Sequence, residues 1–238
     1  MEHTKIQIET NDQYQIEQDE DIWEAYTCGF LPSESIYKIA IKSPLEGHKE
    51  VVRIFEDSQL ICRSLLHPRC RAFKGQITTE DGQDLLFSYT KECGCPTMCW
   101  SRPEYDIFDH ENVKIGRIKN VCKFCGMEIQ ILDANDDLIY TIKSSMCHWG
   151  AACEPFCGKC CALTFDIRDE RKDGVITSQF KKTSRGCWKE LMFNANKYEL
   201  HIPPTMNYNE RIMLCVGVHQ LDVLWFTMKS PSIFCMHR

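Results

Sequence analysis

The stretch that most constrains the fold is residues 212–226, with the sequence IMLCVGVHQLDVLWF. Apart from His219, Gln220 and Asp222, every residue in it is apolar or cysteine. A helix that is apolar on nearly every face is enclosed by protein or by lipid. The stretch is shorter than the ~20 residues of a membrane span, and an aspartate costs ~2.5–3.5 kcal/mol at mid-membrane. We therefore predict a helix enclosed by protein. The alternative is a buried strand, although strands average only ~5–6 residues.

Alternating polar and apolar residues dominate from residue 36 to about residue 193. The runs 36–42 and 51–55 flank the turn-like segment 43–50, and the runs 72–77 and 85–89 flank the turn 80–83. A shorter alternating run covers residues 13–17. This pattern is typical of antiparallel hairpins.

An internal repeat is visible in the same region. Residues 84–118 and 137–176 each read as a strand, a cysteine-bearing segment, a strand, a turn and a strand. Repeated antiparallel units favour a meander that closes on itself, because closure removes exposed strand edges. We expect a mainly β fold: a closed barrel of about twelve antiparallel strands that encloses the apolar helix near residues 207–226.

Composition limits the functional classes. The net charge of −6 disfavours a general nucleic-acid binder, which usually carries excess positive charge. The first residues, MEHTKIQIE, show neither the basic-then-apolar pattern of a signal peptide nor the Met-Gly start that myristoylation needs. We therefore expect the sixteen cysteines to lie in a reducing compartment, as free, acylated or metal-bound thiols.

The cysteine clusters allow two chemistries beyond simple thiols. Two pairs have the spacing of zinc ligands and could form one four-thiolate site: Cys122, Cys125, Cys157 and Cys160. A second cluster, Cys93, Cys95 and Cys99, lies among small residues, and acyl chains on it would anchor a soluble domain.

One dense basic patch contains Lys181, Lys182, Arg185 and Lys189. It could contact anionic lipid head groups, act in nuclear import or nucleic-acid binding, or form a solvated turn. Residues 194–199 resemble half of a calcium loop but fit a polar loop beside a strand better. The sequence has no phosphate-binding glycine loop, nucleophile elbow or His-Glu metal motif.

Taken in order, these residues resemble the phospholipid scramblase family. The similarity runs from ETNDQYQI (9–16) through the Cys93 cluster, EYDI (104–107), VKIG (113–116) and LTFDI (163–167). It continues with WKE (188–190) and FNAN (193–196) and ends in Gly217–Phe226, where Asp222 occupies a position at which the family keeps an aspartate. The resemblance implies a Tubby-like barrel: about twelve strands around a hydrophobic C-terminal helix that here contains Gly217, Asp222 and Phe226.

The family resemblance also implies an activity. Members are expected to move phospholipids between membrane leaflets without ATP, in response to calcium, and to be held at the membrane by palmitoylated cysteines. The acylated cluster corresponds to Cys93, Cys95 and Cys99, and the calcium loop to residues 194–205, with Asn194, Asn196, Tyr198 and Leu200 as candidate ligand positions. A nuclear-import segment corresponds to residues 174–188.

These observations lead to one main hypothesis and one alternative. Residues 1–8 and 229–238 are expected to be tails, and residues 9–228 the barrel domain. We expect a non-enzymatic phospholipid scramblase on the cytoplasmic face of the plasma membrane, with the nucleus as a second location. Its expected partners are membrane phospholipids and further copies of itself, and no specific nucleic acid. The alternative is a membrane-associated or nuclear interaction module that does not transport lipid and uses its cysteines for zinc.

Overall fold

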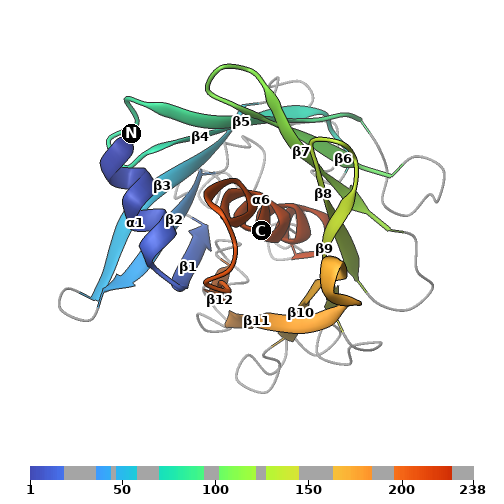
Figure 1. Cartoon of the computed structure of the whole chain (residues 1–238). Helices are drawn as coiled ribbons and strands as arrows, with labels where there is room; N and C mark the ends of the chain where they lie inside the picture. Colours follow the sequence, from blue (N-terminus) through green and yellow to red (C-terminus); the bar gives the residue numbers. More distant parts are fainter. Residues whose placement is uncertain are drawn as a thin grey trace, which may run out of the picture.

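Twelve antiparallel strands form a closed barrel around one helix in the computed structural model (Figure 1). The structure describes residues 1–18, 36–43, 47–57, 70–93, 102–121, 127–144, 163–183 and 196–226. The strands are β1 (Gln13–Gln18), β2 (Ile36–Ser43), β3 (Gly47–Asp57), β4 (Phe73–Thr79), β5 (Leu85–Lys91), β6 (Glu104–Asp109), β7 (Lys114–Asn120), β8 (Glu128–Asp133), β9 (Leu138–Ser144), β10 (Leu163–Asp169), β11 (Val175–Thr183) and β12 (Lys197–His201). The helices are α1 (Glu2–Thr10), η1 (Glu170–Lys172), α6 (Tyr208–Leu221) and η2 (Asp222–Phe226).

Each strand pairs with its neighbour in sequence, and β1 pairs with both β2 and β12, so the meander closes. The predicted closed barrel is therefore confirmed. The predicted turn at 43–50 is shorter than expected, because β3 begins at Gly47. The sequence analysis did not identify β8 and read part of β12 as a polar loop. Five residues of alternating burial pair β12 with both β1 and β11.

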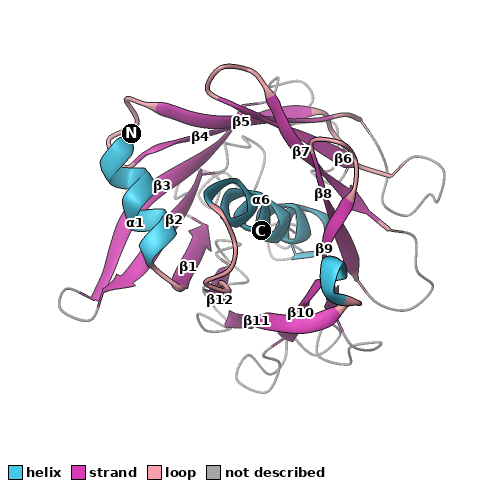
Figure 2. Cartoon of the chain, viewed as in Figure 1, coloured by secondary structure: helices cyan, strands magenta, loops and turns pink. Residues whose placement is uncertain are grey.

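The barrel has two different ends. At one, short connections such as residues 80–84, 110–113, 134–137 and 170–174 join consecutive strands, and we call it the turn end. At the other, the far end, the strands are joined through 19–35, 58–69, 94–101, 122–126, 145–162 and 184–195, which lie outside the described residues. The chain enters α6 at the turn end and runs toward the far end (Figure 2).

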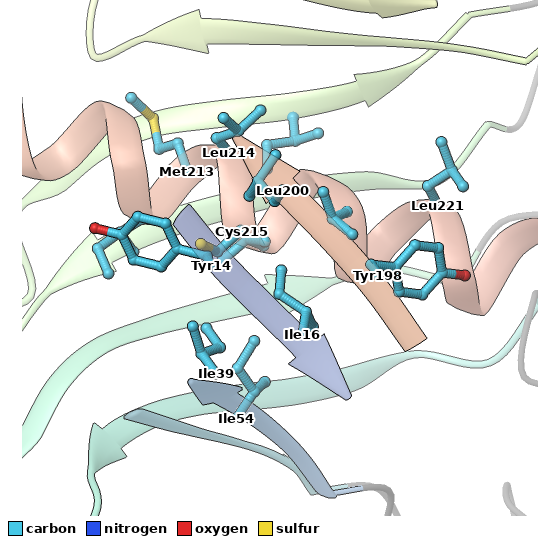
Figure 3. Packing of buried hydrophobic residues seen from close by; sticks show 14 of the residues in the cluster. Tyr14, Ile16, Ile39, Ile54, Tyr198, Leu200, Met213, Leu214, Cys215 and Leu221 are labelled. Carbon is cyan, nitrogen blue, oxygen red and sulfur yellow. The ribbon is translucent and has the colours of Figure 1, made fainter. Parts of the chain in front are cut away.

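The central helix is buried from its third residue onward, as the apolar pattern predicted. Every residue from 210 to 221 is buried, and η2 continues the helix as one π-helical turn in which only Trp225 is partly exposed. Inward-facing strand residues such as Ile16 and Leu200 pack against Leu214 and Cys215 (Figure 3). A helix that is apolar all round is stable only when it is enclosed in this way.

Two glycines allow the helix and the wall to approach each other closely. A Cβ on Gly217 of α6 would lie 3.1 Å from Cδ1 of Ile142. A Cβ on Gly116 of β7 would lie 2.3 Å from Sδ of Met213 and 2.5 Å from the backbone oxygen of Leu132, so there is no room for a side chain between β7 and α6. Gly217 on the helix and Gly116 on the barrel wall therefore determine how closely α6 approaches the strands.

The expected N-terminal tail contains helix α1, which packs against α6 and β3. Ile8 is 2% exposed, and the carbonyl oxygens of Ile8 and Asn11 accept hydrogen bonds from Arg211 of α6. Because Arg211 is itself 1% exposed, these carbonyls satisfy a buried cation. Residues 2–10 thus belong to the packed structure around the turn end.

Candidate functional site

The most polar part of the barrel interior surrounds the last turns of the central helix. Asp222, at the junction of α6 and η2, is 0% exposed. Its Oδ2 accepts a hydrogen bond from the Tyr37 hydroxyl at 2.7 Å, and its Oδ1 accepts from the Asn196 amide at 2.7 Å and the Tyr198 hydroxyl at 2.5 Å. We call Asp222, Tyr37, Asn196 and Tyr198 the Asp222 cluster. It ties the end of the helix to β2 and to the segment that begins β12.

Burial and hydrogen bonding shift the pKa of Asp222 in opposite directions. Burial raises the pKa of this carboxyl above its ordinary value, because the charged form loses contact with water. Hydrogen bonds from Tyr198 and Tyr37 and the charge on Lys182 favour the charged form and limit that rise. Lys182 is 4% exposed, and its ammonium lies 4.5 Å from the ring centroid of Phe226. The barrel thus supplies donors and a cation to a carboxylate that would be unstable alone in an apolar interior.

His219 lies one helical turn before Asp222 and faces a group of aromatic rings. The ring of Tyr37 packs edge-on to it at 4.5 Å, and the rings of Phe73, Tyr89 and Tyr105 surround it at 5.6 to 6.5 Å. Its Nδ1 lies 3.3 Å from the Tyr89 hydroxyl, and its Nε2 has no hydrogen-bond partner in the structure. Burial lowers the pKa of His219 to about 3, so the imidazole is neutral at physiological pH.

The same end of the barrel holds a buried ion pair. Arg71 and Glu56 form a salt bridge in which both side chains are 1% exposed. Lys91 donates to the carbonyl of Arg71, and burial lowers the pKa of its ammonium to about 8. Removing one partner of such a pair leaves an uncompensated buried charge, so these groups fix the ends of β3, β4 and β5 relative to one another.

The helix is also fixed at its start. Asn207 caps α6 through a capping box with Glu210, in which each side chain accepts from the other's backbone N–H. Glu210 then accepts from the Tyr140 hydroxyl at 2.9 Å and from Arg171 at 2.7 Å. Polar contacts therefore hold both ends of an otherwise apolar helix, and they determine its register along the barrel axis.

The structure separates residues that the sequence grouped as a basic patch. The Lys181 side chain is exposed on β11, whereas that of Lys182 points into the barrel toward Phe226. Successive strand residues face opposite sides of a sheet, so adjacent lysines cannot share one surface. Arg185 and Lys189 lie outside the described residues.

The predicted calcium positions also face the interior where they are described. The side chains of Asn196 and Tyr198 bond to Asp222, and Leu200 is 1% exposed in the core, while Asn194 lies outside the described residues. These inward side chains do not fit a calcium loop that opens to solvent. Within the described ranges, no three His, Cys, Asp or Glu side chains gather as a metal site requires.

The cysteine predictions fall mostly outside the described residues. Cys93 is exposed just after β5 at the far end, with its thiol free. The other acylation candidates and the zinc set lie outside the described residues: Cys95, Cys99, Cys122, Cys125, Cys157 and Cys160. Acylation and zinc binding both stay predictions.

Sequence reasoning singled out Asp222 but not its partners. Alternation in residues 36–42 places Tyr37 on the same face as Ile39 and Ile41, which indicates an inward ring. Nothing local indicates that its hydroxyl meets a carboxylate 185 residues away. In the sequence His219 is one of three polar residues in the apolar run, and nothing local predicts the aromatic rings that surround it.

Comparison with known proteins identifies the family. No helix in the described part of the chain has both the length and the apolar character of a membrane span. No solved structure matches the chain. The family described as Scramblase matches residues 6–228, which is nearly the whole sequence and includes the second half of α1, every described strand and the central helix. The chain therefore belongs to the Scramblase family.

Proposed function

We propose that this chain is a phospholipid scramblase, which lets phospholipids move in both directions between the leaflets of a membrane without ATP. The observation that carries the proposal is the family match over residues 6–228. Because lipid movement between leaflets makes and breaks no covalent bond, the protein would act as a facilitator of transport and not as an enzyme.

We place the protein at the cytoplasmic face of the plasma membrane, attached through acyl chains on Cys93, Cys95 and Cys99. The exposed thiol of Cys93, just beyond the end of β5, supports this placement because an acylated cysteine must reach solvent and lipid. Two acyl chains are enough for stable attachment of a folded domain. The far end of the barrel would then be the end that faces the membrane.

In our proposal the central helix stays inside the barrel during transport. Its apolar side chains each gain about 1.5–3 kcal/mol from burial. Withdrawal would also leave the buried donors of Tyr37, Asn196 and Tyr198 without their shared acceptor. Lipids would therefore move along the outside of the protein, where it thins or disorders the bilayer, and not along a helix that leaves the barrel.

Calcium activation stays a prediction in this account. The described part of the expected loop turns Asn196, Tyr198 and Leu200 toward the interior, so no step of the proposed transport depends on a calcium ion there.

The test is reconstitution of the purified protein in liposomes that carry a fluorescent phospholipid. Dithionite bleaches only the outer leaflet, so inner-leaflet fluorescence survives unless lipid exchanges between leaflets. We expect protein-containing liposomes to lose the protected fraction with and without calcium, whereas protein-free liposomes keep it. Retention of the protected fraction at high protein loading would contradict the transport proposal and would leave the family and the fold unaffected.

A further inference from the structure

Part of strand β11 has a free edge at the turn end of the barrel. β11 spans Val175–Thr183, but β12 pairs only with Phe180–Thr183. The residues before Phe180 pair with β10 alone, with a bulge at Thr177. The barrel is closed along most of its height, but here the backbone of β11 is paired on one side only, and on the other side the Ser178 hydroxyl donates to the carbonyl of His201.

The chain after β12 cannot fill this position. The backbone N–H of Ile202 donates to the carbonyl of Asp12 at 2.8 Å, which directs the chain toward β1. Pro203 and Pro204 follow, and proline has no N–H to donate to a strand ladder. The residues that follow β12 therefore leave this edge of β11 without a paired strand.

A groove runs along this edge. Its volume is about 410 Å³, and it is lined by Ile176, Thr177, Ser178, Gln179, Lys181, Glu199 and His201. Ile176, which lines the groove, is 47% exposed, and Val175 before it on β11 is 57% exposed. No residue from Val175 to Phe180 is charged. Native proteins usually protect a strand edge with charges or proline, and apart from the bulge these six residues carry neither.

The rim of the barrel at the turn end is acidic, and the groove lies on its β11 side with Glu199 and Lys181 in its lining. The short connections and the strand residues beside them carry ten carboxylate side chains that are exposed or half-buried: Glu80, Asp81, Asp84, Asp109, Glu111, Asp133, Asp136, Asp137, Glu170 and Asp173. The same connections carry three basic residues, Lys114, Arg171 and Lys172, each of which is in a salt bridge with an aspartate. A second copy of the chain would bring the same carboxylates face to face, and an anionic membrane would also be repelled.

We propose that the free edge of β11 binds a short extended segment of a partner protein as an added strand, and that this segment alternates basic with apolar residues. Strand addition supplies backbone hydrogen bonds for affinity and alternate side-chain contacts for specificity. Apolar side chains would pack on Ile176, which lines the groove, and basic side chains would face the nearby carboxylates of Glu170, Asp173 and Glu199. This inference goes beyond the proposed function, because lipid movement does not require it.

The first test uses a fluorescein-labelled hexapeptide of alternating lysine and valine and the full-length chain. Fluorescence polarisation should show binding that weakens with added salt, whereas the matched peptide of alternating glutamate and valine should bind at least tenfold more weakly. In an added strand, every second backbone amide of the peptide points toward the edge of β11 and the others point away. N-methylation of the amides that point toward β11 should abolish binding, and N-methylation of the others should not. Equal binding of both peptides, or indifference to both methylation patterns, would overturn the proposal.

A pair of variants locates the site. Ile176→Lys places a cation on the edge and should weaken binding of the lysine–valine peptide at least tenfold. Val113→Lys makes the same change at a residue that is 55% exposed on another connection of the turn end, and it should alter binding less than twofold. Both side chains are exposed, so equal thermal midpoints should confirm that both variants fold. Equal loss in the two variants would show a general charge effect and no edge site.

Hydrogen exchange provides an independent readout. The amides of residues 175–179 should gain protection when the lysine–valine peptide binds, and those of β7 should not. If these amides are already protected because the purified chain dimerises, the occupant is a second copy and the partner-segment proposal fails. Neither result changes the outcome of the liposome assay.

Discussion

The hydroxyl of Tyr37 on β2 and the carboxylate of Asp222 at the end of α6 lie 2.7 Å apart, although 185 residues separate them in the sequence. Asn196 and Tyr198 donate to the same carboxylate, and all four side chains are buried. Apolar packing alone would tolerate shifts of the enclosed helix along the barrel axis. The hydrogen bonds of the Asp222 cluster therefore fix the position of the helix.

Loss of the Asp222 carboxylate should destabilise the fold. Asp222→Ala leaves three buried donors without an acceptor, and we expect a loss of about 2–4 kcal/mol in the free energy of unfolding. Asp222→Asn keeps the side-chain volume and one acceptor and should cost less. Urea denaturation measures both. Glu199→Ala, at an exposed position, should change stability by less than about 0.5 kcal/mol. An Asp222→Ala loss no larger than that would contradict the assigned role.

His219 should make the protein sensitive to acid. Burial lowers its pKa to about 3, so between that value and its ordinary value near 6.5 the unfolded chain binds a proton that the folded chain excludes. The stability contributed by neutral His219 is thus fully present above pH 6.5 and falls as the pH drops toward 3. Asp222 acts in the opposite direction, because its raised pKa favours the protonated form in the folded state.

One variant can show whether His219 causes the pH dependence of stability. His219→Phe keeps an aromatic ring among the surrounding rings and removes the titrating group. The difference in stability between the two proteins should change as the pH falls from 6.5 to 4, because only the parent chain loses the histidine contribution, on the order of 1.4 kcal/mol per pH unit. A constant difference between the curves over this range would rule out a buried neutral His219.

Gly116 should not tolerate a side chain. A Cβ there would lie 2.3 Å from Sδ of Met213 and 2.5 Å from the carbonyl oxygen of Leu132. The methionine can move but the backbone oxygen cannot, so Gly116→Ala should cost about 1–3 kcal/mol. Adding Met213→Ala should not restore stability, since the contact with Leu132 remains. Full recovery in the double variant would show that the thioether was the only obstacle.

Helix α1 should contribute to stability through one side chain. Ile8 is 2% exposed and Ile6 is 53% exposed, two residues apart on the same helix. Ile8→Ala should cost about 2–4 kcal/mol, because it opens a cavity against the core. Ile6→Ala is the matched control and should cost less than about 0.5 kcal/mol. Similar effects of the two changes, measured by thermal denaturation, would show that α1 is not docked.

Membrane attachment should depend on the cysteines at the far end. Replacing Cys93, Cys95 and Cys99 by serine should release the protein from the membrane fraction of cells, because no acyl chain can then form on this cluster. Hydroxylamine, which cleaves thioesters, should release the parent protein in the same way. Membrane attachment that survives both treatments would exclude this cluster as the anchor, and stoichiometric zinc in purified protein would favour the alternative interaction module.

Much of the fold follows from local pattern. The apolar run at 212–226 is too long for an ordinary strand and too short for a membrane span, and its enclosure requires a closed wall. The strands that were identified alternate clearly, as in Ile36–Ser43. Lys197–His201 was missed because it is short and polar on its outer face, and its pairing with β1 and β11 makes it a strand.

The site could be predicted only in part. Asp222 is conspicuous because a carboxylate inside an apolar run must be satisfied by something. Its partners come from β2 and from the start of β12, and strand register, which no local pattern specifies, brings them to the helix. The burial of Ile8 could not be predicted either, because residues 2–10 lack an apolar face. The contact with Arg211 gives α1 its position.

The central claim is that lipids cross while the helix stays inside the barrel. A disulfide between Gly217→Cys and Ile142→Cys can test it, since a Cβ on residue 217 lies 3.1 Å from Cδ1 of Ile142, so positions 217 and 142 face each other across the helix and the wall. The dithionite assay is run on the oxidised and reduced double variant, with each single variant oxidised as a control for the native cysteines. We predict that oxidised and reduced proteins flip lipid at rates within about twofold of each other. Loss of flipping on oxidation of the double variant alone, with recovery on reduction, would contradict the account.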